Sequence, residues 1–172
     1  WKAVLERRSP AGIALTRQNV PVLERGTGAA EGETLAAAHH VAKGAYVLAE
    51  AANGSPDVIL IATGSEVSVA LDARTQLAER GVHARVVSAP CLEWFDEQSA
   101  EYRESVLPAA VTARVSVEAG LALSWHRYVG DRGRTVSIEH FGASADYQTL
   151  FREFGITAEA VAAAALESIA AA

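Results

Sequence analysis

Apolar and polar residues form alternating blocks along this chain, and the blocks predict strands and helices in turn. Residues 58–62 (VILIA) are a continuous apolar run, typical of a strand that is buried on both faces of a parallel sheet. The next block has the spacing of a helix with one apolar face, formed by Val67, Ala70, Leu71, Leu77 and Ala78. Gly81 follows at the place where such a helix ends.

The same pattern continues to the end of the chain. Further strands are predicted at residues 44–50, 84–88, 114–118 and 135–138. Helices are predicted at residues 96–106, around Trp125 and Tyr128, at 147–154, and after Thr157, which can cap the last one.

Close alternation of strands and helices predicts an α/β fold with right-handed crossovers. We expect three layers: a mainly parallel, mixed sheet of about five strands with helices on both of its faces. The strand at 44–50 has no long helix between it and 58–62, so it can pair antiparallel at an edge of the sheet.

The first part of the chain has a different character. Residues 1–8 have helical composition, without a start methionine or an N-cap, and residues 12–16 predict a short apolar strand. Residues 24–33 (ERGTGAAEGE) are rich in glycine and glutamate, which is typical of an exposed linker. We therefore expect the chain to be a piece of a longer protein, opening on the last helix and last strand of a preceding domain.

Composition excludes several classes of function. A formal net charge of −6 argues against a nucleic-acid surface, and we expect neither a membrane span nor a signal peptide. Cys91 is the only cysteine, so the chain has no internal disulfide and no cysteine metal cluster. These features favour a reducing, cytoplasmic location.

Two motifs that sometimes carry chemistry favour structural roles here. Gly64-Ser65-Glu66 stands between a buried strand and a helix, where backbone N–H groups can hold an anion. However, no further glycine follows at phosphate-loop spacing and Glu66 is negative, so a tight turn with Ser65 as N-cap is favoured. Cys91 has no neighbouring base or positive charge, which favours a passive thiol.

The histidines do not suggest a metal site. His39 and His40 are adjacent, so on a helix they point about 100° apart. His83, His126 and His140 are scattered along the chain. We therefore expect no metal ligands.

Arg17 is the strongest candidate for a binding residue. It follows the predicted strand directly and stands beside Gln18 and Asn19. A planar guanidinium at the mouth of a strand can bind a phosphate or carboxylate with two parallel hydrogen bonds. A salt bridge at a domain boundary is an equal alternative from the residues alone.

Several runs of the chain, taken in order, resemble the C-terminal end of the transketolase family: LTRQNVP (15–21), GAYVLAEA (44–51), DVILIATGSEVSVALDA (57–73), ARVVSAP (84–90) and FREFGIT (151–157). The resemblance covers essentially the whole chain. It implies that residues 1–25 end a pyrimidine-binding domain, that 26–34 are a linker, and that 35–172 are the C-terminal domain.

The resemblance also implies a function for a longer parent enzyme. This would be a cytoplasmic, homodimeric transferase that moves a two-carbon ketol unit between sugar phosphates of the pentose phosphate pathway. It would use thiamine diphosphate and a divalent cation, Mg²⁺ or Ca²⁺. In the family, the arginine of an [ST]-R-Q segment helps to bind the substrate phosphate, and this position corresponds to Arg17.

The family's catalytic and cofactor residues lie upstream of this region. The resemblance therefore implies that the piece alone binds no cofactor or metal and is inactive. Two alternatives stay open: a free-standing regulatory or interaction module of the same fold, and the same region of a dihydroxyacetone synthase.

Overall fold

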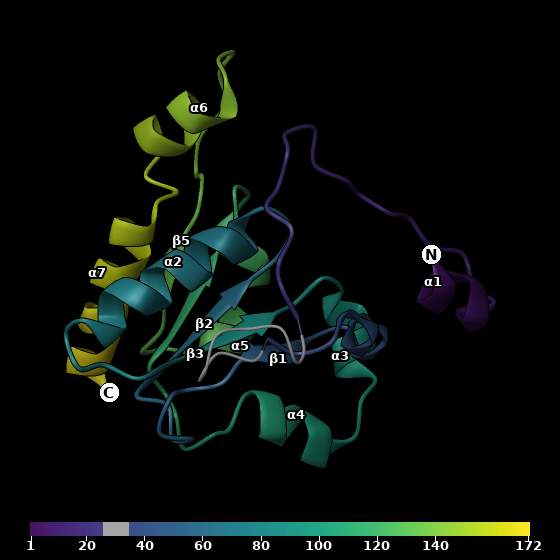
Figure 1. Cartoon of the computed structure of the whole chain (residues 1–172), viewed down its shortest axis with the longest axis horizontal. Helices are drawn as coiled ribbons and strands as arrows, with labels where there is room; N and C mark the ends of the chain where they lie inside the picture. Colours follow the sequence, from purple (N-terminus) through teal and green to yellow (C-terminus); the bar gives the residue numbers. More distant parts are fainter. Residues whose placement is uncertain (26–34) are drawn as a thin grey trace.

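A five-stranded sheet in the order β1-β3-β2-β4-β5 forms the centre of the molecule (Figure 1). This is a computed structural model, and it describes residues 1–25 and 35–172, so the predicted linker at 26–34 lies outside the described residues. The strands are β1 (Tyr46–Ala49), β2 (Val58–Ala62), β3 (Ala84–Ser88), β4 (Arg114–Val117) and β5 (Arg134–Val136). β1 pairs antiparallel with β3, and the other pairs are parallel. The predicted mixed α/β sheet, with its antiparallel edge strand, is confirmed.

Alternate residues of β2 point to opposite faces of the sheet and create two separate cores. Val58, Leu60 and Ala62 face the helices α2 (Glu66–Ala78) and α7 (Ala158–Ala171). Leu60 is completely buried, and burying a side chain of this size contributes roughly 1.5–3 kcal/mol to stability. Because both faces of β2 are covered, its sequence is continuously apolar instead of alternating.

Three short helices cover the opposite face: α3 (Leu92–Asp96), α4 (Ala100–Val106) and α5 (His126–Val129). The second core joins Ile59 and Ile61 of β2 to Phe95, Trp125 and other buried residues of these helices and their flanks. The predicted helix at 96–106 was wrong in extent, because α3 ends at Asp96 and the helix that follows, α4, begins at Ala100. Ser99 caps the second of them by accepting a hydrogen bond from the Tyr102 N–H.

The remaining helices lie at the periphery: α1 (Lys2–Arg7), the 3₁₀ helices η1 (Ala38–Lys43) and η2 (Ala122–Ser124), and α6 (Tyr147–Glu153). The predicted cap at Thr157 is confirmed, since its side chain accepts a hydrogen bond from the Ala160 N–H at 3.2 Å. Asp146 caps α6 in the same way, through the Thr149 N–H at 2.9 Å.

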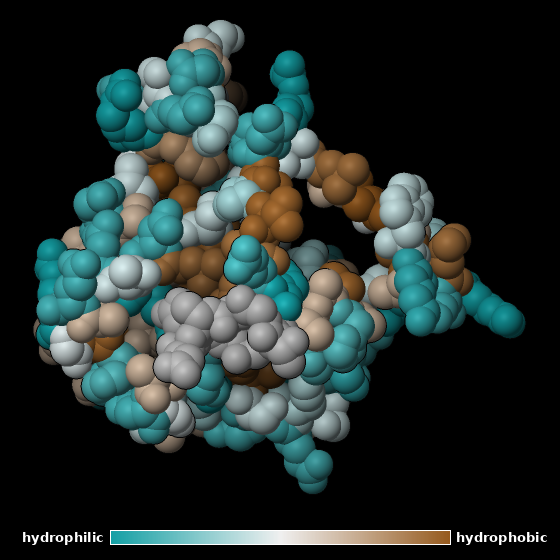
Figure 2. All heavy atoms as spheres, in the orientation of Figure 1, coloured by the Kyte–Doolittle hydropathy of each residue, from teal (hydrophilic) through white to brown (hydrophobic). Residues whose placement is uncertain are grey.

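The strand predicted at residues 12–16 does not form. The helix before it is present as α1, but the segment after α1 is extended and irregular, and it pairs with no strand among residues 1–25 and 35–172. Leu15 and Val22 are 80% and 94% exposed, and Figure 2 shows apolar surface along the arm that carries this segment. An apolar run forms a strand only where a neighbouring strand accepts its backbone hydrogen bonds, and none of the described strands does so.

One stretch, Tyr147–Ala171, is long and apolar enough to cross a membrane by length and composition alone. The expectation that the chain has no membrane span stays a prediction, because the core helix of a globular domain meets the same criterion. Gly155, at φ 72°, separates the stretch into α6 and α7. α7 buries Val161, Ala162 and Ala165 in the first core, and a helix that packs on a sheet needs this apolar composition.

A hydrogen-bonded clamp aligns the beginnings of β2 and β3. The Asp57 N–H donates to the His83 carbonyl oxygen at 2.8 Å, and the Asp57 carboxylate accepts from the His83 N–H at 2.8 Å. The same carboxylate oxygen lies 3.1 Å from His83 Nδ1. The hydrogen bond from the His83 N–H is the main cause that lowers the pKa of Asp57 below its ordinary value of 3.8.

We expect this clamp to weaken in acid. Because the folded state lowers the pKa of Asp57, its contribution to stability is fully present above about pH 4 and is lost as the pH falls through the folded pKa. Asp57→Asn cannot ionise, so its thermal midpoint should fall less steeply than that of the wild type below pH 4. Thermal unfolding between pH 2 and 7 measures this, with Asp72→Asn on the exposed side of α2 as control. Parallel pH profiles for wild type and Asp57→Asn would contradict it.

Candidate functional site

The carboxyl ends of the neighbouring strands β2 and β4 are the place where this type of fold offers a ligand site. The chain leaves β2 for β3 on one side, and later reaches β4 on the other side of β2. In open α/β sheets, ligands bind outside the carboxyl ends of strands at such a switch point. Here the turn at residues 63–65 follows β2, and residues 118–120 follow β4.

The carboxylate of Glu66 lies between the segments that follow β2 and β4. Glu66 is 6% exposed, and its Oε1 accepts a hydrogen bond from the Ala119 N–H at 3.1 Å. Its Oε2 accepts from the Ser65 hydroxyl at 3.0 Å. As the first residue of α2, Glu66 also places its negative charge at the positive end of the helix dipole. The Glu66 carboxylate therefore occupies the position at the helix N-terminus where an anionic ligand would bind, and it would repel such a ligand.

The expected N-cap role of Ser65 was wrong in detail. Ser65 precedes α2, but its side chain accepts no hydrogen bond from the helix backbone, and its φ and ψ of −66° and −27° are helical. Its hydroxyl is instead directed to Glu66, and it also accepts a hydrogen bond from Gln18 Nε2 at 3.1 Å. The sequence pattern did not predict this contact, because Gln18 and Ser65 are 47 positions apart.

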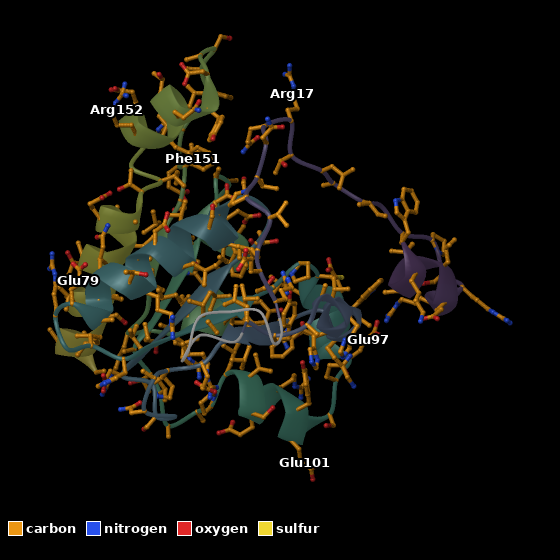
Figure 3. All side chains as sticks on the ribbon, in the orientation of Figure 1. Arg17, Glu79, Glu97, Glu101, Phe151 and Arg152 are labelled. Atoms are coloured by element: carbon orange, nitrogen blue, oxygen red, sulfur yellow. The ribbon has the colours of Figure 1, made fainter. Side chains whose placement is uncertain are left out.

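Arg17 lies at the tip of the N-terminal arm, next to this contact, and its side chain points away from the body of the molecule (Figure 3). The chain bends at Arg17 and Gln18, and Thr16 Oγ1 donates to the Gln18 carbonyl oxygen at 3.2 Å. Within residues 1–25 and 35–172, Arg17 forms no hydrogen bond or ion pair. The salt-bridge alternative for Arg17 therefore finds no partner in that part of the chain, and the guanidinium is available to a ligand.

The arm is fastened to the domain at both of its ends. Near its start, Arg7 forms an ion pair with Glu97 and lies 4.7 Å from the centre of the Trp94 ring. Near its end, Arg25 donates to the Ala36 carbonyl oxygen at 2.6 Å and to the Tyr46 hydroxyl at 3.3 Å. Arg17 thus lies on a segment that contacts the same domain near both of its ends.

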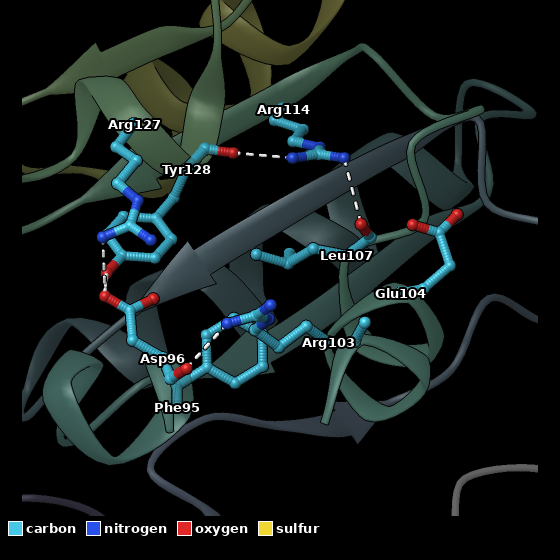
Figure 4. A pocket seen from close by; sticks show the side chains of 9 residues that line it. Phe95, Asp96, Arg103, Glu104, Leu107, Arg114, Arg127 and Tyr128 are labelled. Atoms are coloured by element: carbon cyan, nitrogen blue, oxygen red, sulfur yellow. Dashed lines mark hydrogen bonds and ion pairs between the residues drawn. The ribbon is translucent and has the colours of Figure 1, made fainter. Parts of the chain in front are cut away.

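A second hollow, of about 310 Å³, opens on the opposite side, between α3, α4 and α5 (Figure 4). Arg103, Arg114 and Arg127 line it, but each already binds protein atoms. Arg114 donates to the carbonyl oxygens of four residues, namely Val111, Tyr128, Leu107 and Pro108. Its burial lowers the pKa of its guanidinium below the ordinary value. Arg114 therefore joins chain segments, and nothing in the sequence pattern distinguished it from an exposed arginine.

Asp96 organises the rim of the same hollow. One of its carboxylate oxygens accepts from Arg127 Nη1 at 2.8 Å and from the Tyr128 hydroxyl at 3.0 Å. Burial, and then the hydrogen bond to Asp96, raise the pKa of Tyr128 to about 12. At neutral pH this phenol stays protonated, so it acts as a structural donor and cannot act as a base.

The described residues do not fit a cofactor diphosphate with its cation. Among residues 1–25 and 35–172, no three His, Cys, Asp or Glu side chains come together as a metal site. The rings of His39 and His40 lie 4.3 Å apart between centres, tilted by 32° to each other. Burial raises the pKa of the Cys91 thiol, and its Sγ lies 3.4 Å from Glu93 Oε2, which agrees with the passive role expected for it.

Comparison with known proteins decides the family. A family model described as the transketolase-like C-terminal domain matches residues 44–157, which include all five strands of the sheet. The chain belongs to the transketolase family. Transketolase from Mycobacterium tuberculosis (strain ATCC 25618 / H37Rv) is 58% identical over 172 residues, which cover 96% of this chain and 23% of that protein. The chloroplastic transketolase of Solanum tuberosum is 50% identical over 95% of this chain and 21% of its own length.

Solved transketolase structures share the fold. Pichia stipitis transketolase in complex with sedoheptulose-7-phosphate has a TM-score of 0.74 and 38% identity, and the match covers 90% of this chain and 20% of that one. The Leishmania mexicana transketolase has a TM-score of 0.71 and the same identity, over 81% of this chain and 19% of that one. The chain thus corresponds to the C-terminal region of transketolases and spans about a quarter of their length.

Proposed function

We propose that this chain serves as the C-terminal region of an enzyme that transfers a two-carbon ketol unit between sugar phosphates. The observation that carries the proposal is the 58% identity to a transketolase over 96% of the chain. A relative at 38% identity is described in complex with sedoheptulose-7-phosphate, a sugar phosphate. We propose that the complete enzyme is a homodimer that uses thiamine diphosphate and a divalent cation, and that it works in the cytoplasm.

We further propose the boundary between the two domains that the sequence suggested. In this division, residues 1–25 complete a pyrimidine-binding domain, and residues 35–172 form the C-terminal domain. The distribution of packing supports it, because the fully buried residues of both cores lie at position 45 or later. From residues 1–25, Leu23 alone is among the partly buried hydrophobic residues packed on these cores.

Within this enzyme we assign Arg17 to the phosphate group of the substrate. Its guanidinium is exposed and forms no ion pair with residues 1–25 and 35–172, so binding a phosphate requires no existing partner to be displaced. The guanidinium offers the two parallel donors that match phosphate oxygens. The buried negative charge of Glu66, by contrast, disfavours a phosphate at the carboxyl ends of β2 and β4.

The catalytic chemistry would then belong to other parts of the enzyme. Thiamine diphosphate supplies the carbanion chemistry of ketol transfer when it is bound, while the protein supplies binding and orientation. Holding it requires a cation site for the diphosphate and an acidic partner for its pyrimidine ring. The described residues offer no such cluster, so we propose that this chain alone is inactive.

We expect the isolated 172-residue chain to bind no thiamine diphosphate at micromolar cofactor, with or without Mg²⁺. Titration calorimetry on the purified chain measures this. A full-length transketolase titrated under the same conditions is the positive control. Saturable heats from the isolated chain would contradict the assignment of cofactor binding to other parts of the enzyme.

A further inference from the structure

A short relay of hydrogen bonds connects the N-terminal arm to the buried part of the domain. Gln18 Nε2 donates to Ser65 Oγ at 3.1 Å, and Ser65 Oγ donates to Glu66 Oε2 at 3.0 Å. The other oxygen of Glu66 accepts from the Ala119 N–H at 3.1 Å. The relay therefore starts beside Arg17 and ends on the backbone between β4 and η2.

Glu66 determines the direction of every bond in this relay. A carboxylate only accepts hydrogen bonds, so the Ser65 hydroxyl must donate its single proton to Glu66. The lone pairs of Ser65 Oγ are then left for Gln18, which must present its NH₂ group and not its oxygen. The amide of Gln18 is thus held in one of its two orientations, and the backbone next to it is held as well.

The end of the relay is rigid. Glu66 is 6% exposed and begins α2, whose Val67 and Ala70 are part of the first core. Moving the Glu66 carboxylate would leave the Ala119 N–H without its acceptor and would expose a buried charge to apolar neighbours. Ser65 and Glu66 therefore form a fixed point on the domain.

Within residues 1–25 and 35–172, few contacts hold the arm that carries Arg17. Residues 8–24 contain no helix or strand. Of the hydrogen bonds that join residues 8–24 to residues 35–172, the Gln18–Ser65 bond is the single one in the structure. Among the described residues, this contact is therefore the hydrogen bond that ties the bend at Arg17 and Gln18 to the C-terminal domain.

We propose that Ser65 and Glu66 of the C-terminal domain are positioning residues for Arg17, and that they act through Gln18 to aim its guanidinium at the substrate phosphate. The proposal rests on the phosphate role assigned to Arg17 above. It gives the C-terminal domain a part in substrate recognition that acts through Arg17. In a full-length transketolase that carries this chain, removing the relay should weaken phosphate binding without changing the chemical step.

The test is steady-state kinetics of the full-length enzyme with a phosphorylated aldose acceptor and with the same aldose lacking its phosphate. Ser65→Ala should raise the KM for the phosphorylated acceptor roughly threefold to tenfold, the range that corresponds to one neutral hydrogen bond. The kcat should stay nearly constant, and the unphosphorylated acceptor should show no change. Ser65→Thr, which keeps a hydroxyl, should restore most of the affinity.

Matched variants separate positioning from a structural effect. Ser68→Ala removes a hydroxyl from the same turn of α2, where Ser68 Oγ donates to the Ser65 carbonyl oxygen, and it should leave both acceptors unchanged. Gln18→Ala and Ser65→Ala should each give the same loss, and the double variant should be no worse than either, because both remove one relay. In an Arg17→Ala background, Ser65→Ala should have no further effect on KM.

The outcomes distinguish this inference from the function on which it rests. If Arg17→Ala discriminates between the two acceptors but Ser65→Ala does not, the positioning role is wrong and the phosphate role stands. If Ser65→Ala lowers kcat or affects both acceptors equally, Ser65 is merely structural. If Arg17→Ala changes the KM of the two acceptors equally, the phosphate role is wrong, and the positioning role is then wrong as well.

Discussion

Gly44→Ala should be among the most damaging single substitutions in this domain. Gly44 ends η1 at φ 84° and ψ −48°, a backbone conformation that residues with a side chain rarely adopt. A Cβ atom there would lie 2.3 Å from the Phe95 nitrogen and 2.4 Å from the Cys91 carbonyl oxygen. Both are backbone atoms, so the clash cannot be relieved by rotating a side chain.

The expected loss combines a conformational and a steric cost. Left-handed backbone costs about 1–2 kcal/mol for an alanine, and overpacking a close contact costs about 1–3 kcal/mol. Together these correspond to a fall of roughly 5–20 °C in the thermal midpoint for a chain of this size. Thermal or urea unfolding of the purified chain measures it.

Gly54→Ala is the matched control. Gly54 has φ 74°, but a Cβ atom there would meet no atom within 4 Å. It should therefore lose the conformational part only, about 1–2 kcal/mol. Equal losses at the two positions would show that the close approach of η1 to α3 contributes nothing to stability.

Arg17→Ala should have the largest effect on substrate affinity in a full-length transketolase that carries this chain. A charge-assisted bond to phosphate contributes roughly 1.5–3 kcal/mol, so losing it should raise the KM for a phosphorylated acceptor about tenfold to a hundredfold. The phosphate is remote from the bond that breaks in ketol transfer. Ground state and transition state therefore lose the same interaction, and kcat should stay nearly intact.

Two further variants sharpen the test of Arg17. Arg17→Lys should recover part of the affinity, because a point charge cannot reproduce two parallel hydrogen bonds. Arg152→Ala, which removes an exposed arginine that pairs with Glu153 on α6, should leave the KM unchanged. Steady-state kinetics with phosphorylated and unphosphorylated acceptors measures all three. If Arg17→Ala affected both acceptors equally, Arg17 would be a structural residue.

The periodicity of the sequence predicted the main elements because it records which faces are buried. The continuous apolar run 58–62 predicted a strand covered on both sides, and β2 occupies those five residues with every one of them buried. The absence of a helix after 44–50 predicted an antiparallel edge, and β1 is that edge. Burial follows from the local alternation of residues, so the local sequence was sufficient for these features.

The same local pattern failed where the decisive partner is distant. Residues 12–16 have the composition of a strand, yet they form none, since no described strand lies beside them to pair with. The helix predicted at 96–106 begins later, at Ala100, because Ser99 caps α4, while Asp96 is the last residue of the separate helix α3.

For the candidate site, local sequence was enough for the family resemblance, for Arg17 beside Gln18, and for the turn Gly64-Ser65-Glu66 after a buried strand. The folded chain was needed to show that the Glu66 carboxylate binds the Ala119 N–H beyond β4, and that Gln18 and Ser65 meet. The physical reason is the range of the interactions. Hydrophobic periodicity is a property of neighbouring residues. The acceptor for the Ala119 N–H is instead Glu66, 53 positions away, and the order of strands in the sheet brings the two together.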